Sequence, residues 1–152
     1  MEHKVTQIDP QVLIPQLLEL LEDTPTVPLL ISGNSMSPFL IHGRDTVYLS
    51  KITQPPKRGD MILYRRDGGG YVLHRVFDAG DTCTMVGDAQ TLLEKGIRPD
   101  QMLARVTAVR RKGKMLQKGS FWWDFFETVW IRMVPARPAI RSAYSRIKKL
   151  TD

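Results

Sequence analysis

Six short runs rich in β-branched and aromatic residues, each bounded by turn sequences, are the feature that most constrains the fold of this chain. Short strands at this spacing favour an antiparallel, mainly β domain. Residues 67–70, Asp-Gly-Gly-Gly, separate two of the runs and predict the tip of a hairpin. The six predicted strands are residues 27–31, 46–49, 61–64, 71–77, 82–86 and 103–109.

Helical patterns flank the β region on both sides. Asp9-Pro10 predicts the start of a short helix that ends near Thr24-Pro25. After Gly119, apolar and aromatic residues recur at helical spacing up to Pro135, and a second amphipathic segment begins at Ile140. We therefore predict three parts in a mainly β fold: an N-terminal helical segment (1–26), a β-rich domain (27–118) and an aromatic and basic helical tail (119–152).

Several classes of protein are excluded by composition. The apolar stretch 12–21 contains Pro15 and Glu19 and does not have the form of a secretory signal. The uncharged stretch 24–43 is interrupted by prolines and glycines, which argues against a membrane span. Cys83 is the single cysteine, so an intrachain disulfide and a thiolate-rich metal site are excluded. We expect a cytoplasmic protein, free or peripheral on a membrane, without a cofactor.

The basic residues are concentrated in the last third of the chain. Residues 1–104 hold 10 basic and 13 acidic residues, whereas residues 105–150 hold 12 and 2. Such a skew predicts either an anionic partner for the tail or a well-solvated basic surface. The aromatic residues of 119–152 suit a helix on an anionic membrane, and equally a helix that covers the β domain. Aromatic and basic residues mostly segregate, which argues against a nucleic-acid partner.

The segment Ser32-Gly33-Asn34-Ser35-Met36 follows directly on a predicted strand. A serine at this point, two residues after a glycine, suits a nucleophile on a tight turn, where backbone N–H groups can face a developing oxyanion. The alternative is a serine-rich loop without chemistry. A serine nucleophile needs a base within hydrogen-bond reach, and His74, in the alternating run 71–77, is the candidate. His3 and His42 are the other two histidines, and a structural role for His74 is the alternative.

The order of short motifs along the chain supports the hypothesis that Ser35 is a nucleophile and His74 its base. Gly33-x-Ser35-Met36-x-Pro38 is followed by Gly43-Arg44-Asp45, Arg58-Gly59-Asp60, a strand with His74-Arg75, Gly87-Asp88 and Leu103-Ala104-Arg105-Val106. This series resembles the signal peptidase I superfamily of serine proteases, which includes the self-cleaving LexA-type repressors. The resemblance covers residues 27–109 and is closest to the branch whose base is His followed by Arg, as in the endoplasmic-reticulum and archaeal enzymes.

The resemblance implies a coiled, partial-barrel β-sheet and a serine endopeptidase in which Ser35 attacks and His74 serves as base. For the acid that orients His74 it leaves Asp88 and Glu94 open, with Asp81 as a remoter candidate. Asp45 and Asp60 are expected to bind local backbone N–H groups instead. The oxyanion and substrate-binding candidates are Ser32, Gly33 and Met36 together with the Ser35 amide; Gly33 stands where the family often has serine.

By the same resemblance, the substrate is a protein or peptide bound as an extended strand, with residues 29–32 and 61–64 as the expected walls of its site. From the 26 residues before the first predicted strand, we expect neither the transmembrane helix nor the DNA-binding domain that usually precedes the serine motif in this superfamily. The alternative function is a non-catalytic module on the same fold that binds a peptide or a membrane surface.

Overall fold

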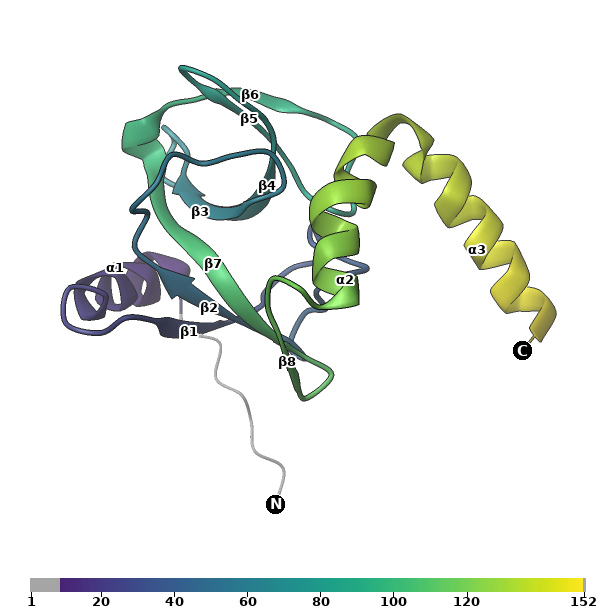
Figure 1. The fold of residues 1–152 in the computed structure, drawn as a ribbon, viewed down its shortest axis with the longest axis horizontal. Helices are drawn as coiled ribbons and strands as arrows, with labels where there is room; N and C mark the ends of the chain where they lie inside the picture. The colour runs from purple at the N-terminus through teal and green to yellow at the C-terminus, as the bar shows by residue number, and fades with distance from the viewer. Residues whose placement is uncertain (1–8, 152) are drawn as a thin grey trace.

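The chain forms one antiparallel sheet of eight strands, flanked by helices at both ends (Figure 1). The structure, a computed structural model, describes residues 9–151. The strands follow the spatial order β1-β2-β7-β3-β4-β5-β6, and β8 pairs with β7. The sheet is open, since β1 and β6 lie at its two ends. Its strands are β1 (Val27–Leu30), β2 (Thr46–Ser50), β3 (Met61–Arg65), β4 (Tyr71–Ala79), β5 (Cys83–Val86), β6 (Glu94–Ile97), β7 (Met102–Arg111) and β8 (Lys114–Leu116).

Helix α1 (Pro10–Leu20) begins as the sequence predicts. The Asp9 side chain accepts a hydrogen bond from the N–H of Gln11 at 2.9 Å, and Pro10 occupies the first helical position, where no N–H is needed. Ile14 and Leu17 bury one face of the helix against the sheet. A 3₁₀ turn (Pro99–Gln101) precedes β7.

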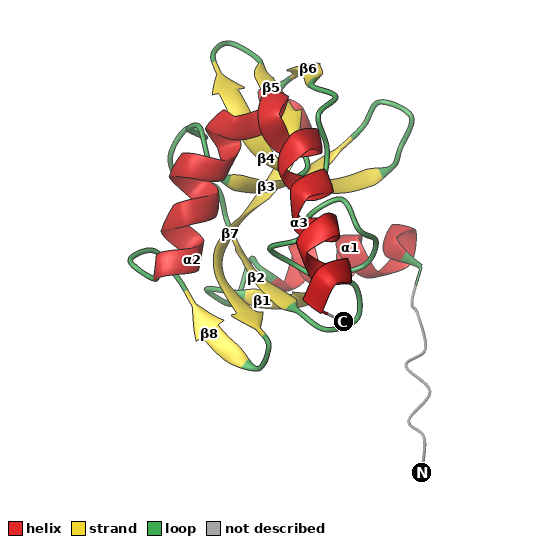
Figure 2. Ribbon diagram, turned by 90° about the vertical axis from the view of Figure 1, so that its right-hand side faces the viewer, coloured by secondary structure: helices red, strands yellow, loops and turns green. Residues whose placement is uncertain are grey.

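The C-terminal tail consists of two different parts. Helix α2 (Phe121–Asp124) continues through a π-helical turn (Phe125–Val129) and a 3₁₀ segment (Trp130–Ala136) with a kink at Met133. Trp123, Phe126 and Trp130 are buried, so this part covers the β domain. Helix α3 (Arg137–Thr151) then projects from the body (Figure 1), and it lies in front of the body when seen from that side (Figure 2). Among residues 9–151 no helix has the length and apolar character to cross a membrane.

The main core lies between α1, the β1-β2-β7 part of the sheet, the segment after β1 and the aromatic helix. Met36, Phe39 and Leu40 enter this core although they belong to no strand or helix. A second cluster joins β3, β4, β5 and β6. The segment that carries Ser35 is therefore fixed by core packing on its C-terminal side.

The predicted mainly β fold with a short N-terminal helix and a C-terminal helical tail is confirmed, and each of the six predicted runs forms a strand. Two strands were missed. β6 (Glu94-Lys-Gly-Ile97) and β8 (Lys114-Met-Leu116) lack the alternation that identifies a strand, and their backbone pairing with β5 and β7 determines their conformation. Helix α1 also stops earlier than expected, with turns between Leu20 and Thr24.

Asp45 and Asp60 each bind a local backbone N–H as predicted; each also pairs with an arginine, Arg44 and Arg105 respectively, and Asp45 binds one N–H that is distant in sequence. The buried Asp45 carboxylate accepts from the N–H groups of Ile41 at 2.9 Å and Lys112 at 3.0 Å. Asp60 accepts from the N–H of Lys57 at 3.0 Å. Both carboxylates hold turns in place.

Candidate active site

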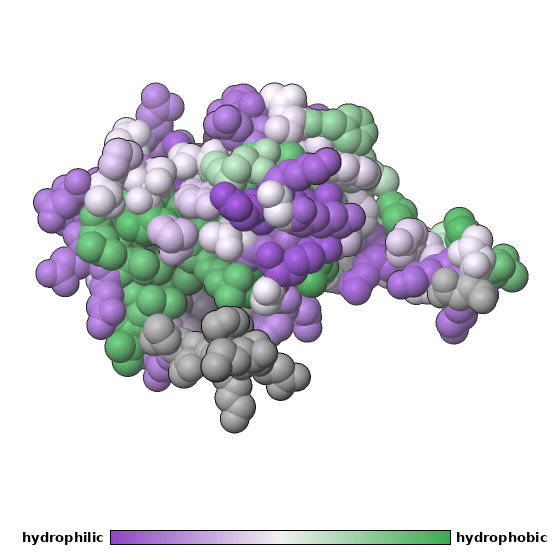
Figure 3. Space-filling view, turned by 90° about the horizontal axis from the view of Figure 1, so that it is seen from below, coloured by the Kyte–Doolittle hydropathy of each residue, from purple (hydrophilic) through white to green (hydrophobic). Residues whose placement is uncertain are grey.

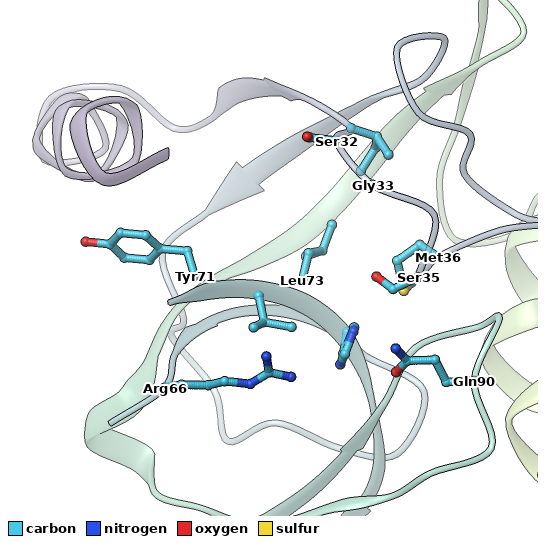
Figure 4. Close-up of a pocket in the computed structure, with 11 residues that line it drawn as sticks. Ser32, Gly33, Ser35, Met36, Arg66, Tyr71, Leu73 and Gln90 are labelled. Carbon is cyan, nitrogen blue, oxygen red and sulfur yellow. The ribbon is translucent and has the colours of Figure 1, made fainter. Parts of the chain in front are cut away.

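Ser35 and His74 line the same surface pocket, which has a volume of about 300 Å³ (Figure 4). Ser35 comes from the segment between β1 and β2, and His74 comes from β4, so the fold brings together side chains that are far apart in sequence. Figure 4 shows the Ser35 hydroxyl directed into the pocket, with the Gln90 amide at the same end. The remaining lining residues are Ile31, Ser32, Gly33, Met36, Arg66, Tyr71, Val72 and Leu73.

The Ser35 segment leaves β1 through a glycine with a left-handed backbone. Gly33 has φ +84°, a conformation that disfavours side chains, and its N–H donates to Nδ1 of His42 at 2.8 Å. Immediately after Ser35, the Met36 side chain is buried in the main core. Ser35 is therefore held in place on one side by the turn at Gly33, which is bonded to His42, and on the other side by the buried Met36.

The loop after β5 contacts the Ser35 backbone directly and holds it in place. The Ala89 N–H donates to the Ser35 carbonyl at 2.9 Å. Gly87 approaches the same carbonyl so closely that a Cβ at this position would collide with it. The approach explains why a glycine precedes Asp88, since any side chain there would displace the backbone of Ser35.

His74 is buried in β4, where it pairs with Ile62 of β3. In the same register Tyr64 of β3 pairs with Val72, so Tyr64 lies diagonally across from His74 on the same face of the sheet. Its hydroxyl oxygen lies 3.2 Å from Nδ1 of His74. The β3–β4 hairpin thus places a phenol beside the imidazole.

Tyr64 connects His74 to Glu94, the first residue of β6. The Tyr64 hydroxyl donates its one hydrogen to Oε1 of Glu94. The bond to His74 then requires Nδ1–H as the donor and Tyr64 as the acceptor, which leaves Nε2 of His74 unprotonated. Glu94 is in turn paired with Arg66, with a distance of 2.8 Å between Nε and Oε2. The chain of contacts selects the imidazole tautomer that a general base needs.

The environment keeps the His74 imidazole neutral. Burial, followed by the positive charge of Arg66, lowers the pKa of His74 to about 4, although the negative charges of Glu94 and Asp88 act in the opposite direction. Burial tends to raise the pKa of Glu94, but hydrogen bonds from Arg66 and Tyr64 bring it below its usual value. Burial and the bond to Glu94 raise the pKa of Tyr64. At neutral pH the site therefore contains a neutral imidazole, a neutral phenol and an ionised carboxylate.

Of the two acids that the sequence left open, Glu94 is linked to His74, through Tyr64, and Asp88 is committed to an ion pair. The Asp88 carboxylate accepts two hydrogen bonds from Arg75, at 2.9 and 3.0 Å, and both side chains are buried. Arg75 also donates to the Gly59 carbonyl at 2.7 Å. The pair joins β4, the loop before β3 and the loop after β5. The role of Asp88 is therefore to hold these segments together. Asp81 is exposed in the turn between β4 and β5.

The residues predicted to stabilise an oxyanion all line the pocket. Not all of their hydrogen-bond donors are free to bind an oxyanion beside Ser35. The Gly33 N–H is already used by His42, and Figure 4 shows the Ser32 hydroxyl pointing away from Ser35. The Met36 side chain serves as a core anchor. Gln90 was not predicted: its Oε1 accepts from the Gly87 N–H at 3.2 Å, and its amide nitrogen faces the end of the pocket that holds Ser35 (Figure 4).

The substrate walls are partly those expected from the sequence. Ile31 and Ser32 line the pocket. The expectation for residues 61–64 was wrong, because β3 is paired with β4 on one side and β7 on the other and has no free edge. The second wall is the first half of β4. Its pairing with β5 begins only at Arg75, so Tyr71–His74 bind β3 on one side and face the pocket on the other.

The remaining candidate ligands are dispersed. His42 is bound to the Gly33 turn, and His3 lies outside the described residues. Between residues 9 and 151, no group of three His, Cys, Asp or Glu side chains is arranged to hold a metal ion. The free thiol of Cys83 is buried in the second hydrophobic cluster.

Comparison of the chain with protein-family models, with curated proteins and with solved structures gives no match.

Proposed function

We propose that this protein is a serine endopeptidase in which Ser35 is the nucleophile and His74 is the general base. The observation that carries the proposal is that Ser35 shares a pocket with an imidazole whose Nδ1 is bound to Tyr64, so that Nε2 is free to accept a proton. Activation of a serine hydroxyl requires an imidazole nitrogen that can accept its proton, and Nε2 of His74 is the proposed acceptor. Glu94, through Tyr64, orients the imidazole in this proposal, while Asp88 supports the loop structurally.

The chemistry follows from these roles. His74 Nε2 removes the proton from the Ser35 hydroxyl as its Oγ forms a bond to the scissile carbonyl carbon. The imidazolium then returns the proton to the leaving amine as the C–N bond breaks, which leaves an acyl ester on Ser35. A water molecule, deprotonated in the same way, hydrolyses the ester. The Tyr64–Glu94 contact stabilises the transient positive charge on the imidazole.

The Ser35 N–H and the Gln90 side-chain amide are the proposed donors to the oxyanion. Gln90 is oriented by its bond to the Gly87 N–H, which fixes its oxygen and directs its NH₂ group toward Ser35. A donor held in place before the reaction stabilises the charge without reorganisation. Gly33 does not contribute its N–H, which is bound to His42.

The substrate is a protein or peptide segment in extended conformation. The free edge of Tyr71–His74 and Ser32, which follows β1, lie on opposite walls of the pocket and offer backbone groups to a strand inserted between them. Strand addition supplies affinity through main-chain hydrogen bonds. This mode agrees with the resemblance of residues 27–109 to the signal peptidase I superfamily and its coiled sheet, which we retain as a proposal together with a cytoplasmic location.

Incubation of the purified protein with a peptide library, followed by mass spectrometry, tests the proposal. Wild type is expected to cleave a subset of peptides, and Ser35→Ala is expected to lose the activity while keeping its thermal unfolding profile. Ser37→Ala is the matched control, since it removes a hydroxyl two residues away in the same segment.

Equal cleavage by wild type and Ser35→Ala would show that the activity does not come from this site. Cleavage by neither, with retained binding of an extended peptide to the pocket, would favour the alternative of a non-catalytic peptide-binding module. Loss of activity in Ser35→Ala alone supports the endopeptidase.

A further inference from the structure

Helix α3 carries an apolar face that the body of the protein leaves largely uncovered. Ile140, the fourth residue of the helix, packs on the main core, and Arg141 donates to the Ala89 carbonyl at 2.9 Å. Beyond these contacts the apolar residues are exposed: Tyr144 by 68%, Ile147 by 61% and Leu150 by 86%. These three residues follow Ile140 at helical spacing and lie on its side of the helix.

The charges of α3 are all of one sign. Residues 137–151 contain five basic and no acidic residues. Arg137 is buried and donates to the carbonyls of Gly87, Gln90 and Trp130. The other four, Arg141, Arg146, Lys148 and Lys149, are exposed. At helical spacing, Arg141 and Lys148 border the apolar face on one side and Arg146 borders it on the other.

Other exposed apolar and basic residues lie toward the same side of the molecule as the free end of α3. In both ribbon views the β7–β8 hairpin, the start of α2 and the free end of α3 lie toward the lower side of the molecule (Figures 1 and 2). Met115 and Phe121 are exposed in the first two elements, and Lys112 lies in the hairpin turn, with Lys114 at the start of β8. Seen from below, the projecting α3 shows apolar atoms beside hydrophilic ones (Figure 3).

From this arrangement we propose that α3 binds the surface of a membrane rich in anionic lipids. The tail surface, defined as Tyr144, Ile147 and Leu150 with the basic residues Arg141, Arg146, Lys148 and Lys149, has the composition of an interfacial helix. Its apolar side chains enter the boundary between headgroups and acyl chains, and its basic side chains contact lipid phosphates. Each basic residue near such a surface raises the partition coefficient about fivefold.

The aromatic part of the tail has a different role. Sequence alone left open whether residues 119–152 lie on a membrane or on the β domain. The burial of Trp123, Phe126 and Trp130 commits the segment before Arg137 to the β domain. Lipid binding is therefore assigned to α3. Since Arg137 and Arg141 attach the start of α3 to the loop that carries Gln90, membrane contact fixes the Ser35 pocket at a set position relative to the lipid surface.

Vesicle co-sedimentation tests the proposal without reference to catalysis. Wild type and Ser35→Ala are both expected to sediment with vesicles of equal parts phosphatidylglycerol and phosphatidylcholine, to bind pure phosphatidylcholine vesicles far more weakly, and to dissociate as salt is raised. Leu150→Ser lowers the partition coefficient about tenfold. Lys148→Glu/Lys149→Glu lowers it by at least about tenfold.

Two matched controls accompany these variants. Leu92→Ser removes a leucine that is exposed by 84%, almost as much as Leu150, and Lys57→Glu/Lys95→Glu changes the net charge equally at exposed positions away from α3. Both controls are expected to bind within about twofold of wild type. Circular dichroism melting checks that every variant is folded, since the altered side chains of α3 lie outside the core.

Four results would overturn the proposal. Wild type could fail to bind the anionic vesicles, or the tail variants could bind as well as the controls. Self-association of wild type that Leu150→Ser abolishes, without vesicle binding, would identify a second copy of the chain as the partner. Binding of duplex DNA in place of vesicles, lost in Lys148→Glu/Lys149→Glu and kept in Leu150→Ser, would identify a nucleic-acid surface.

Discussion

The hydroxyl oxygen of Tyr64 lies 3.2 Å from Nδ1 of His74, and the same hydroxyl donates its hydrogen to Glu94. One phenol thereby determines which nitrogen of the imidazole carries the proton. In proteases with a direct His–carboxylate contact, the acid itself performs this task. Here the acid acts through an inserted tyrosine, and the pair of residues Tyr64 and His74 is fixed by the register of the β3–β4 hairpin.

Tyr64→Phe removes this relay and keeps the ring. We expect kcat to fall by at least about tenfold, because the imidazole loses the partner that selects its tautomer. The unpaired Nδ1–H of the buried His74 also costs about 1–3 kcal/mol of unfolding free energy. Steady-state kinetics and chemical denaturation measure the two effects. Tyr48→Phe, a half-buried tyrosine of β2, is the control, and an unchanged kcat in Tyr64→Phe would contradict the relay.

Substitution of the two acids separates their roles. Glu94→Gln is expected to lower kcat by at least about tenfold, because Glu94 acts on His74 through its hydrogen bond to Tyr64. The change in stability is expected to be small, because Glu94 is partly exposed. Asp88→Asn is expected to cost about 3–5 kcal/mol of unfolding free energy, because it leaves the buried Arg75 without its counter-charge. Parallel kinetic and denaturation measurements distinguish them. A stable Asp88→Asn that is inactive would transfer the orienting role to Asp88.

The pKa of His74 sets the acid limit of the reaction. Protonated imidazole cannot accept the Ser35 proton, so activity falls as the pH falls through the pKa of His74. Because burial and Arg66 hold that pKa at about 4, kcat/KM is expected to stay constant from neutral pH down to about pH 5 and to reach half its plateau near pH 4. Arg66→Gln is expected to raise the midpoint. A wild-type midpoint near 6.5, the ordinary value for histidine, would contradict the buried, neutral base.

The close approach of Gly87 to the Ser35 carbonyl predicts a strong effect of a single methyl group. Gly87→Ala forces the two loops apart, and we expect a loss of about 1–3 kcal/mol in stability together with most of the activity. Gly70→Ala is the matched control: both glycines have an ordinary φ, and a Cβ at Gly70 meets no atom within 4 Å. Equal behaviour of the two variants, measured by denaturation and peptide cleavage, would contradict the proposed contact.

Much of the fold could be predicted because its strands carry local signals. The six runs with β-branched and aromatic residues and the Asp9-Pro10 helix start behave as their patterns predict. β6 and β8 contain lysine and, in β6, a glycine with φ +79°, and they are strands only because β5 and β7 offer them backbone partners. Such pairing depends on tertiary structure and leaves no periodic trace in the sequence.

The sequence identifies those site residues that stand out by their own residue type. It does not identify those that are brought to the site by the meeting of several segments. Ser35 and His74 stand out by residue type, and the pocket contains both. Tyr64 could have been found from the predicted hairpin tip at residues 67–70, since the resulting register places it diagonal to His74. Gln90 and the Arg75–Asp88 ion pair gave no such signal, because loop conformation alone positions them.

The most direct measurement of the central claim is a double-mutant cycle of Ser35→Ala and His74→Ala, with cleavage rates determined on one peptide substrate. If the two side chains act as one unit, each single variant loses nearly all activity above the background, and the double variant is no slower than either. Rate losses that multiply in the double variant, or a single variant that retains the wild-type rate, would contradict activation of Ser35 by His74.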